Sequence, residues 1–137
     1  MTLIADSNFV YALFNSEDTR HTDAMGFVSQ ITEVMLVPDV SLPEVCYLIS
    51  RDLGHSGIRR FLEYFSQLDA PLEPIEMGDL DRAREILVTY DDAEFDIVDC
   101  CIMAIAEREN ITRIATFDRR DFSIFQPNHC DYLELLP

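Results

Sequence analysis

Short apolar runs alternate along the chain with longer segments of helical periodicity. The runs, which predict buried strands, lie at residues 2–5, 34–37, 72–75, 113–116 and 132–135. Continuous rather than alternating apolar runs are typical of parallel strands that are covered on both faces. The pattern therefore predicts an α/β fold: a three-layer α/β/α sandwich with a mostly parallel sheet of four or five strands.

The segments between these runs carry apolar residues at helical spacing. They predict helices at residues 7–15, 19–33, 41–52, 58–68, 79–90 and 97–109. Gly54 and Gly57 indicate a turn between the third and fourth helices, and residues 91–96 form an acidic loop. Because the chain has no repeat, linker or low-complexity segment, we expect residues 1–137 to form one domain.

The charge of the chain excludes several kinds of chemistry. Asp and Glu number 26 against 10 basic residues, all of them Arg, which gives a formal net charge of −16. Without Lys there is no Walker A phosphate loop and no Schiff-base enzyme. Phosphatases of the haloacid dehalogenase type and response-regulator receivers also fit poorly, because both usually carry a Lys near their Asp. Such an acidic chain is not expected to bind nucleic acid non-specifically.

Cysteine usage and the N-terminus predict a cytoplasmic protein. The four cysteines form no Cys-x-x-Cys pair and no zinc pattern with the three His, so we expect free thiols in a reducing compartment. The first residues, MTLIADSNF, lack the positive region of a signal peptide. No apolar run approaches the roughly 20 residues of a membrane span.

Four acids follow predicted strands or begin predicted helices at the same end of the sheet. They are Asp6, Glu44, Asp99 and Asp118. Ligands of such folds bind at the carboxyl ends of the strands. Converging carboxylates repel one another unless a hard divalent cation such as Mg²⁺ or Mn²⁺ neutralises them. The constellation therefore predicts a metal site suited to hydrolytic phosphoryl transfer.

The same acids also fit an ordinary structural role as helix caps. Asp6 is placed to cap the first helix, and Ser41-Leu42-Pro43-Glu44 matches a capping box. Two further acid pairs have the spacing of an N-cap and its N3 residue: Asp96 with Asp99, and Asp118 with Asp121. The two interpretations are compatible, because helix N-termini keep carboxylates ionised.

Three segments resemble one protein family in the right order and spacing. Residues 3–8, LIADSN, are similar to the opening strand of PIN-domain nucleases. Residues 97–122 resemble the C-terminal signature of the VapC-type toxins in that family, where an Asp opens an apolar helix and a strand ends in Thr-x-Asp. Residues 41–45 are similar to the family's middle acidic motif.

The resemblance implies roles for individual residues. Asp6, Glu44, Asp99 and Asp118 match the metal-binding, catalytic acids, with Asp118 the most peripheral. The supporting positions are Asn8, Thr116 and Asp92, while Asp96 stands where many relatives have a small residue. Independently of the resemblance, Arg119 and Arg120 are candidates for contact with RNA phosphate, as are Arg59 and Arg60 beside the Gly54–Gly57 turn. The alternative is that these arginines lie in solvated turns or pair with acids of the chain.

The resemblance also implies partners. It predicts a homodimer and a cognate antitoxin that blocks the site, and the acidic surface favours a basic antitoxin segment. The aromatic residues of the predicted helix 58–68, Phe61, Tyr64 and Phe65, either dock a partner segment or pack on the sheet.

The leading prediction is a metal-dependent endoribonuclease, the toxin of a toxin–antitoxin pair. The alternative is a catalytically silent PIN-fold scaffold for protein or RNA, in which the acids act as caps. A phosphatase-like or receiver-like domain is a third interpretation, against which stand the absence of Lys and Asn8 in place of a second Asp.

Overall fold

Five parallel strands form the centre of the computed structural model, which describes residues 1–137. They are β1 (Thr2–Ala5), β2 (Val34–Pro38), β3 (Leu72–Glu73), β4 (Arg113–Ala115) and β5 (Glu134–Leu136). The order in the sheet is β3–β2–β1–β4–β5, and every pairing is parallel. Ile4 of the central β1 lies opposite Leu36 on one side and Ile114 on the other.

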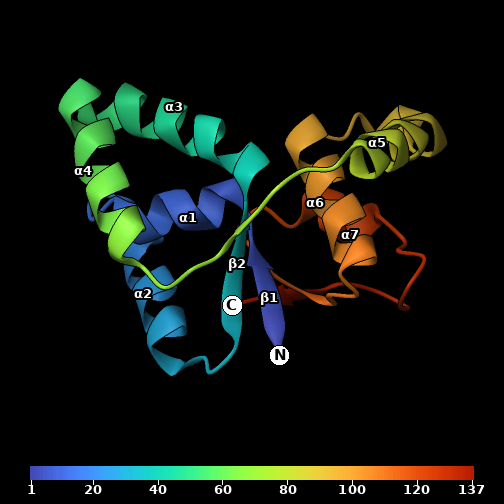
Figure 1. Cartoon of the computed structure of the whole chain (residues 1–137), viewed down its shortest axis with the longest axis horizontal. Coiled ribbons are helices and arrows are strands. Elements are labelled where there is room, and N and C mark those ends of the chain that lie inside the picture. The colour runs from blue at the N-terminus through green and yellow to red at the C-terminus, as the bar shows by residue number, and fades with distance from the viewer.

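Seven α-helices and two short 3₁₀ turns connect the strands. They are α1 (Ser7–Phe14), α2 (His21–Gln30), η1 (Asp39–Ser41), α3 (Leu42–Leu53), α4 (His55–Gln67), α5 (Met77–Thr89), η2 (Asp91–Ala93), α6 (Ile97–Arg108) and α7 (Arg120–Ile124). Helices α1–α4 lie on one side of the sheet and α5–α7 on the other (Figure 1). This arrangement confirms the predicted three-layer α/β/α architecture with a parallel sheet.

The strands supply both faces of the core because their side chains alternate. Leu3 and Ala5 of β1 belong to the cluster that is shared with α1–α4, whereas Ile4 belongs to the cluster on the opposite face. Helix α6 is buried over almost its whole length from Cys100 to Ala106. A helix that is apolar all round is held firmly by its neighbours, so its first turn has a fixed position relative to the sheet.

The strand order changes direction beside β1. The chain proceeds outward from β1 to β2 and β3, then returns across the sheet to β4 and β5 on the other side of β1. The loops that follow β1 and β4 therefore diverge to opposite faces. In open parallel sheets, ligands bind in the crevice at this switch point, outside the carboxyl ends of the two strands.

Several predicted boundaries needed correction. Gly57 does not form a turn: it lies inside α4, which begins at His55, and only Gly54, with φ of +77°, separates α3 from α4. Gly57 is needed for packing, since an added Cβ would lie 2.9 Å from Leu53 Cβ. The five-residue α7 was not predicted, and β5 begins two residues later than the apolar run.

Ion pairs between α5 and α6 tie the second helical layer together. Arg108 of α6 donates to Asp79 of α5 at 2.9 Å and to Glu73 of β3 at 2.8 Å. Arg82 of α5 donates to Glu107 of α6 at 2.7 Å. The carboxylate of Asp79 is almost fully buried, so its pairing with Arg108 matters more than a surface ion pair does.

The four cysteines are free, as predicted, with Cys100 and Cys101 buried in α6. Burial raises the pKa of Cys100 to about 12, which keeps this thiol protonated and unreactive. None of the helices has the length and apolar character needed to cross a membrane.

Candidate active site

Asp6 lies at the carboxyl end of the central strand, where β1 passes into α1. Its backbone N–H donates to the Ala115 carbonyl of β4 at 3.1 Å, so the residue is still held by the sheet. One carboxylate oxygen caps α1 by accepting from the Phe9 N–H at 2.8 Å, and the other accepts from the Thr116 hydroxyl. Asp6 is therefore an N-cap, as the structural alternative proposed, and at the same time stands at the switch point of the sheet.

The electrostatic environment of Asp6 is more than a helix cap requires. Burial raises its pKa from 3.8 to about 7, although the hydrogen bonds from Thr116 and Phe9 act in the opposite direction. The negative charges of Asp118 and Glu44 raise it further. A buried carboxyl that faces other carboxyls lacks compensation by any cation of the chain.

Asp99 occupies the first turn of α6, where the charge of Asp6 acts on it. Its pKa is well above the usual range, first because the group is buried and next because of a hydrogen bond with Asp121 of α7. The charges of Asp6, Asp121 and Asp96 act in the same direction. Burial and the surrounding like charges therefore both favour the protonated form of Asp99.

Glu44 lies in the first turn of α3, after Pro43. The predicted capping box at Ser41 is wrong: Ser41 makes no side-chain cap, and its buried hydroxyl has no hydrogen-bond partner. The backbone conformation explains this. Residues 39–41 form the 3₁₀ turn η1, so Ser41 already has helical dihedral angles, whereas a capping residue is normally extended. Glu44 therefore does not cap the helix. Burial, together with the charge of Asp96, raises its pKa.

Asp6 links the four predicted acids. The charges of Glu44 and Asp118 raise the pKa of Asp6, and the charge of Asp6 raises the pKa of Asp99. Asp118 is exposed at the rim of the crevice, and its N–H donates to the Thr116 hydroxyl at 3.0 Å. Thr116 therefore connects the carboxylate of Asp6 to the loop that carries Asp118.

The other predicted positions lie at varying distances from this group. Asn8 makes no hydrogen bond with Asp6 and lines a neighbouring hollow. Asp92 is exposed in η2 and does not contribute to the raised pKa values of the site. Arg119 donates to the carbonyl of the terminal Pro137, while Arg120 donates to Asp121 at 2.7 Å and to the Ala93 carbonyl at 2.6 Å.

Sequence reasoning missed the part that Asp121 and Asp96 play in the site. Asp96 caps α6 by accepting from the Val98 N–H at 2.8 Å, and its own N–H donates to Asp121 at 3.1 Å. The cap at Asp96 follows the predicted pattern, but Asp121 holds the start of α6 rather than its own helix. A tertiary contact of this kind gives no periodic signal in the sequence.

The donor chemistry of the site fits a hard divalent cation. Carboxylate oxygens are the preferred ligands of Mg²⁺ and Mn²⁺. Burial and neighbouring carboxylates raise the pKa values of Asp6 and Glu44, so a bound cation would favour their ionised forms. The Ser7 hydroxyl is buried without a hydrogen-bond partner. As the side chains stand, no three His, Cys, Asp or Glu residues form a complete ligand group. The carboxylates therefore have to rotate away from their present hydrogen bonds to bind one ion together.

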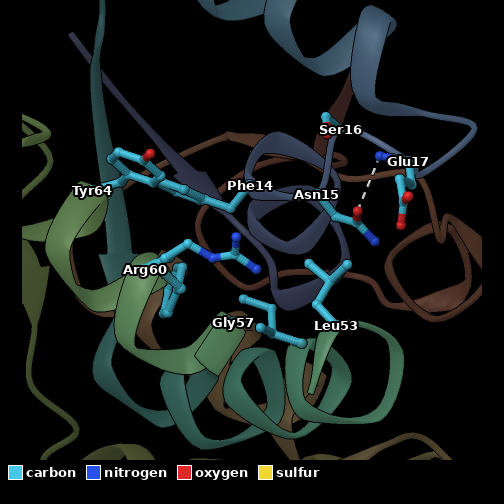
Figure 2. A pocket seen from close by; sticks show the side chains of 10 residues that line it. Phe14, Asn15, Ser16, Glu17, Leu53, Gly57, Arg60 and Tyr64 are labelled. Atoms are coloured by element: carbon cyan, nitrogen blue, oxygen red, sulfur yellow. Dashed lines mark hydrogen bonds between the residues drawn. The ribbon is translucent and has the colours of Figure 1, made fainter. Parts of the chain in front are cut away.

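A second hollow of about 320 Å³ lies away from the acids, between the end of α1 and the α3–α4 pair (Figure 2). Its walls include the aromatic rings of Phe14, Phe61 and Tyr64. Arg60 extends its guanidinium group into the hollow, opposite Asn15. This surface combines apolar walls with one cation, Arg60, and one carboxylate, Glu17.

Comparison with known proteins places the chain in a family. Residues 3–125 match the PIN domain. Ribonuclease VapC26 of Mycobacterium tuberculosis is 22% identical over 125 residues, which cover 91% of this chain and 93% of the relative. The 23S rRNA-specific endonuclease VapC20 of the same organism is 26% identical over 121 residues, covering 88% and 92%.

Solved structures share the fold. The crystal structure of Mycobacterium tuberculosis VapC20, described as a sarcin-ricin loop cleaving toxin, has a TM-score of 0.78 at 24% identity, covering 85% of this chain and 90% of that one. VapBC2 from Rickettsia felis, bound to a promoter DNA fragment, has a TM-score of 0.71 at 14% identity, covering 98% and 97%. Since the matched residues include β1, α3, α6 and β4 with all four acids, the chain belongs to the PIN domain family, and its distant homologues are VapC toxin ribonucleases of toxin–antitoxin systems.

Proposed function

We propose that this protein is a metal-dependent endoribonuclease that hydrolyses RNA phosphodiester bonds as the toxin of a toxin–antitoxin pair. One observation carries the proposal: the buried Asp6 carboxyl interacts with Glu44, Asp99 and Asp118 at the switch point of the sheet. The names of the relatives support RNA as the substrate class.

The chain's own residues divide the work. Asp6, Glu44 and Asp99 would hold the ion, and Asp118 at the rim would help to hold it or a water molecule. Bound Mg²⁺ or Mn²⁺ supplies positive charge that stabilises the phosphodiester transition state and acidifies water. The Thr116 hydroxyl orients Asp6, and Asp121 fixes the start of α6, which carries Asp99. Such outer contacts keep metal ligands aimed at a common point.

The scaffold alternative accounts for only part of this arrangement. Asp6 and Asp96 do cap helices. Glu44 and Asp99 cap none, and both are held at raised pKa by burial and like charges. A scaffold does not need buried carboxyls that repel one another, whereas a cation site is built from such a group.

Cleavage assays with a matched pair of variants test the proposal. Wild type, Asp99→Asn and the control Asp81→Asn, which neutralises an exposed acid of α5, are incubated with total RNA and intact ribosomes of the host. Each reaction contains Mg²⁺, Mn²⁺ or excess EDTA. Wild type and Asp81→Asn should cleave only with metal. The cleavage rate of Asp99→Asn should fall by more than about 100-fold, since loss of a residue that only orients a metal ligand already lowers activity by about 10–100-fold. Equal cleavage in EDTA, or by a folded Asp99→Asn protein, contradicts the metal mechanism.

The antitoxin partner belongs to the same proposal. Several structural neighbours are toxin–antitoxin complexes, among them one from Klebsiella pneumoniae with a TM-score of 0.69 at 15% identity, covering 90% of this chain and 92% of that one. The hollow in Figure 2 offers apolar walls for a side chain of a partner segment. The net charge of −16 favours a segment that is basic overall.

Co-purification from the native host tests the partner. Tyr64 at the edge of the hollow and Tyr132 in the C-terminal segment are both exposed, so they form a matched pair. A small basic protein that inhibits cleavage should accompany wild type and Tyr132→Asp but not Tyr64→Asp. Its equal retention by Tyr64→Asp would move the docking site elsewhere. The homodimer stays a prediction, which sedimentation equilibrium checks.

A further inference from the structure

A hollow of about 360 Å³ adjoins the acidic crevice and shares Asp118 with it. Its lining residues come from the start of α1, the loop before α2, the middle of α3 and the loop after β4. They include two cations, Arg20 and Arg51, beside Asn8, Tyr11 and Phe117. An RNA strand whose scissile phosphate lies at the acids must continue past one side of them, and this hollow opens there.

Most arginines of the chain are unavailable to a polyanion at this place. Half of them form ion pairs with carboxylates: Arg51, Arg82, Arg108, Arg113 and Arg120. The rest have no Asp or Glu carboxylate within 4.0 Å: Arg20, Arg59, Arg60, Arg84 and Arg119. Of these five, only Arg20 lines the hollow beside Asp118. It is therefore the one unpaired cation that faces the site from this side.

Aromatic contacts fix the position of the Arg20 side chain. Its guanidinium carbon lies 5.3 Å from the centre of the Phe117 ring, a distance typical of a cation–π contact. The Phe117 ring in turn stacks on the buried Phe9, with centroids 5.5 Å apart. Phe117, which directly follows Thr116 in the loop after β4, thus supports the guanidinium group. Its ring is not free to stack a base on the side that Phe9 covers.

The backbone of Arg20 is held as firmly as its side chain. Its N–H donates to the Asp18 carboxylate at 2.8 Å. The next residue, His21, contacts the Ala12 carbonyl of α1 through Nδ1 at 2.8 Å. Arg51, the second cation of the hollow, donates two hydrogen bonds of 2.8 Å to Asp52, which neutralises its charge. Arg20 is left as the donor with free hydrogen-bonding capacity.

We infer that Arg20, supported by Phe117, binds a backbone phosphate of the RNA next to the one that is cleaved. The inference rests on the proposed function and identifies a substrate-binding residue for it. A guanidinium group suits this role because it presents several N–H donors in a plane that matches phosphate oxygens. Asp18 and Asp118 in the same hollow limit the subsite to one phosphate contact, so the expected contribution is that of a single charge-assisted hydrogen-bonding group.

Two readouts test the role of Arg20, with Arg84→Ala as the control because Arg84 is an equally unpaired, exposed arginine of α5. The first is the split between kcat and KM for RNA cleavage. Arg20→Ala should raise KM about tenfold and leave kcat within about twofold. Arg20→Lys should recover part of the loss, because it keeps the charge without the planar donor pattern. Arg84→Ala should change neither constant.

The second readout is binding of a fluorescent 12-nucleotide single-stranded RNA of mixed sequence to Asp99→Asn protein over a series of salt concentrations. Adding Arg20→Ala should reduce the slope of log K against log salt by about 0.7, the value for one lost phosphate contact. If Arg20→Ala matches Arg84→Ala in KM and slope, or lowers kcat alone, the subsite is overturned while the nuclease stands. If wild type neither binds nor cleaves RNA, both proposals fall.

Discussion

Replacing Asp6 with Asn should make the metal-free protein more stable. The buried carboxyl of Asp6 has its pKa raised to about 7 in the folded state, mainly by burial, from 3.8 as the reference for an unfolded chain. Well below pH 3.8 the group is protonated in both states and costs nothing. As the pH rises toward 7, the unfolded chain ionises first, and the free energy of unfolding falls with each further increase. Asn is neutral at every pH and remains a good N-cap.

The size of the effect follows from the two pKa values. Their difference of about 3 units corresponds to about 4 kcal/mol at a pH above both, because each unit is worth 1.36 kcal/mol. At pH 5.5 the same values give about 2 kcal/mol. The advantage of Asp6→Asn over wild type should therefore widen by about 2 kcal/mol between pH 5.5 and 8.5. At about 3 °C per kcal/mol for a domain of this size, the melting temperature should differ by about 10 °C at the upper pH.

Urea unfolding in EDTA at pH 5.5, 7.0 and 8.5 measures this difference, and this range avoids the isoelectric point of about 4.2. Asp81→Asn serves as the control, since an exposed carboxyl should give no gap that grows with pH. Excess Mn²⁺ should raise the stability of wild type and not of Asp6→Asn. A gap that is constant with pH, or an Asp6→Asn protein that is less stable at pH 8.5, would refute the reasoning. In that case the ionised cap on α1 outweighs the cost of burial.

Two further predictions concern packing and ion pairing. Gly57→Ala should lower the free energy of unfolding by about 1–3 kcal/mol, because its Cβ would lie 2.9 Å from Leu53 Cβ, whereas Gly26→Ala, with open space around it, should raise it by about 0.5–1 kcal/mol. Urea unfolding compares the two, and equal effects would contradict the packing argument. Arg108→Ala should cost about 3 kcal/mol by leaving the buried Asp79 carboxylate unpaired. Adding Asp79→Asn should recover part of that loss, and no recovery would assign it to other contacts of Arg108.

The sequence allowed most of the fold to be predicted because the strands and long helices carry strong periodic signals. Residues 2–5, 34–37 and 113–116 are apolar runs flanked by polar residues, and each became a strand of the sheet. The short α7 gave no such signal, since five residues complete too few turns for periodicity. Gly57 misled the prediction because glycine indicates both turns and close helix packing, and only the neighbouring helix decides between them.

The four acids of the candidate site were recognisable because each follows a strand or opens a helix at one end of the sheet. Their surroundings were not recognisable. Asp121 reaches Asp99 and the backbone of Asp96 from a helix that the pattern did not reveal. Arg20 gains its place only when Phe117, nearly a hundred positions later in the sequence, comes to lie beneath it. Contacts between distant segments depend on the assembled sheet, so local patterns do not contain them.

The central position of β1 has a consequence for synthesis on the ribosome. Asp6 is made 110 residues before its hydrogen-bond partner Thr116. At a translation rate of roughly 5–20 residues per second, about 5 to 20 s pass between the two. During that time the nascent chain has one half of the crevice and no β4 to complete it. Under the proposed function, the partial chain lacks a complete site for cleavage. A partner that recognises α1–α4 has that interval in which to bind before the site is assembled.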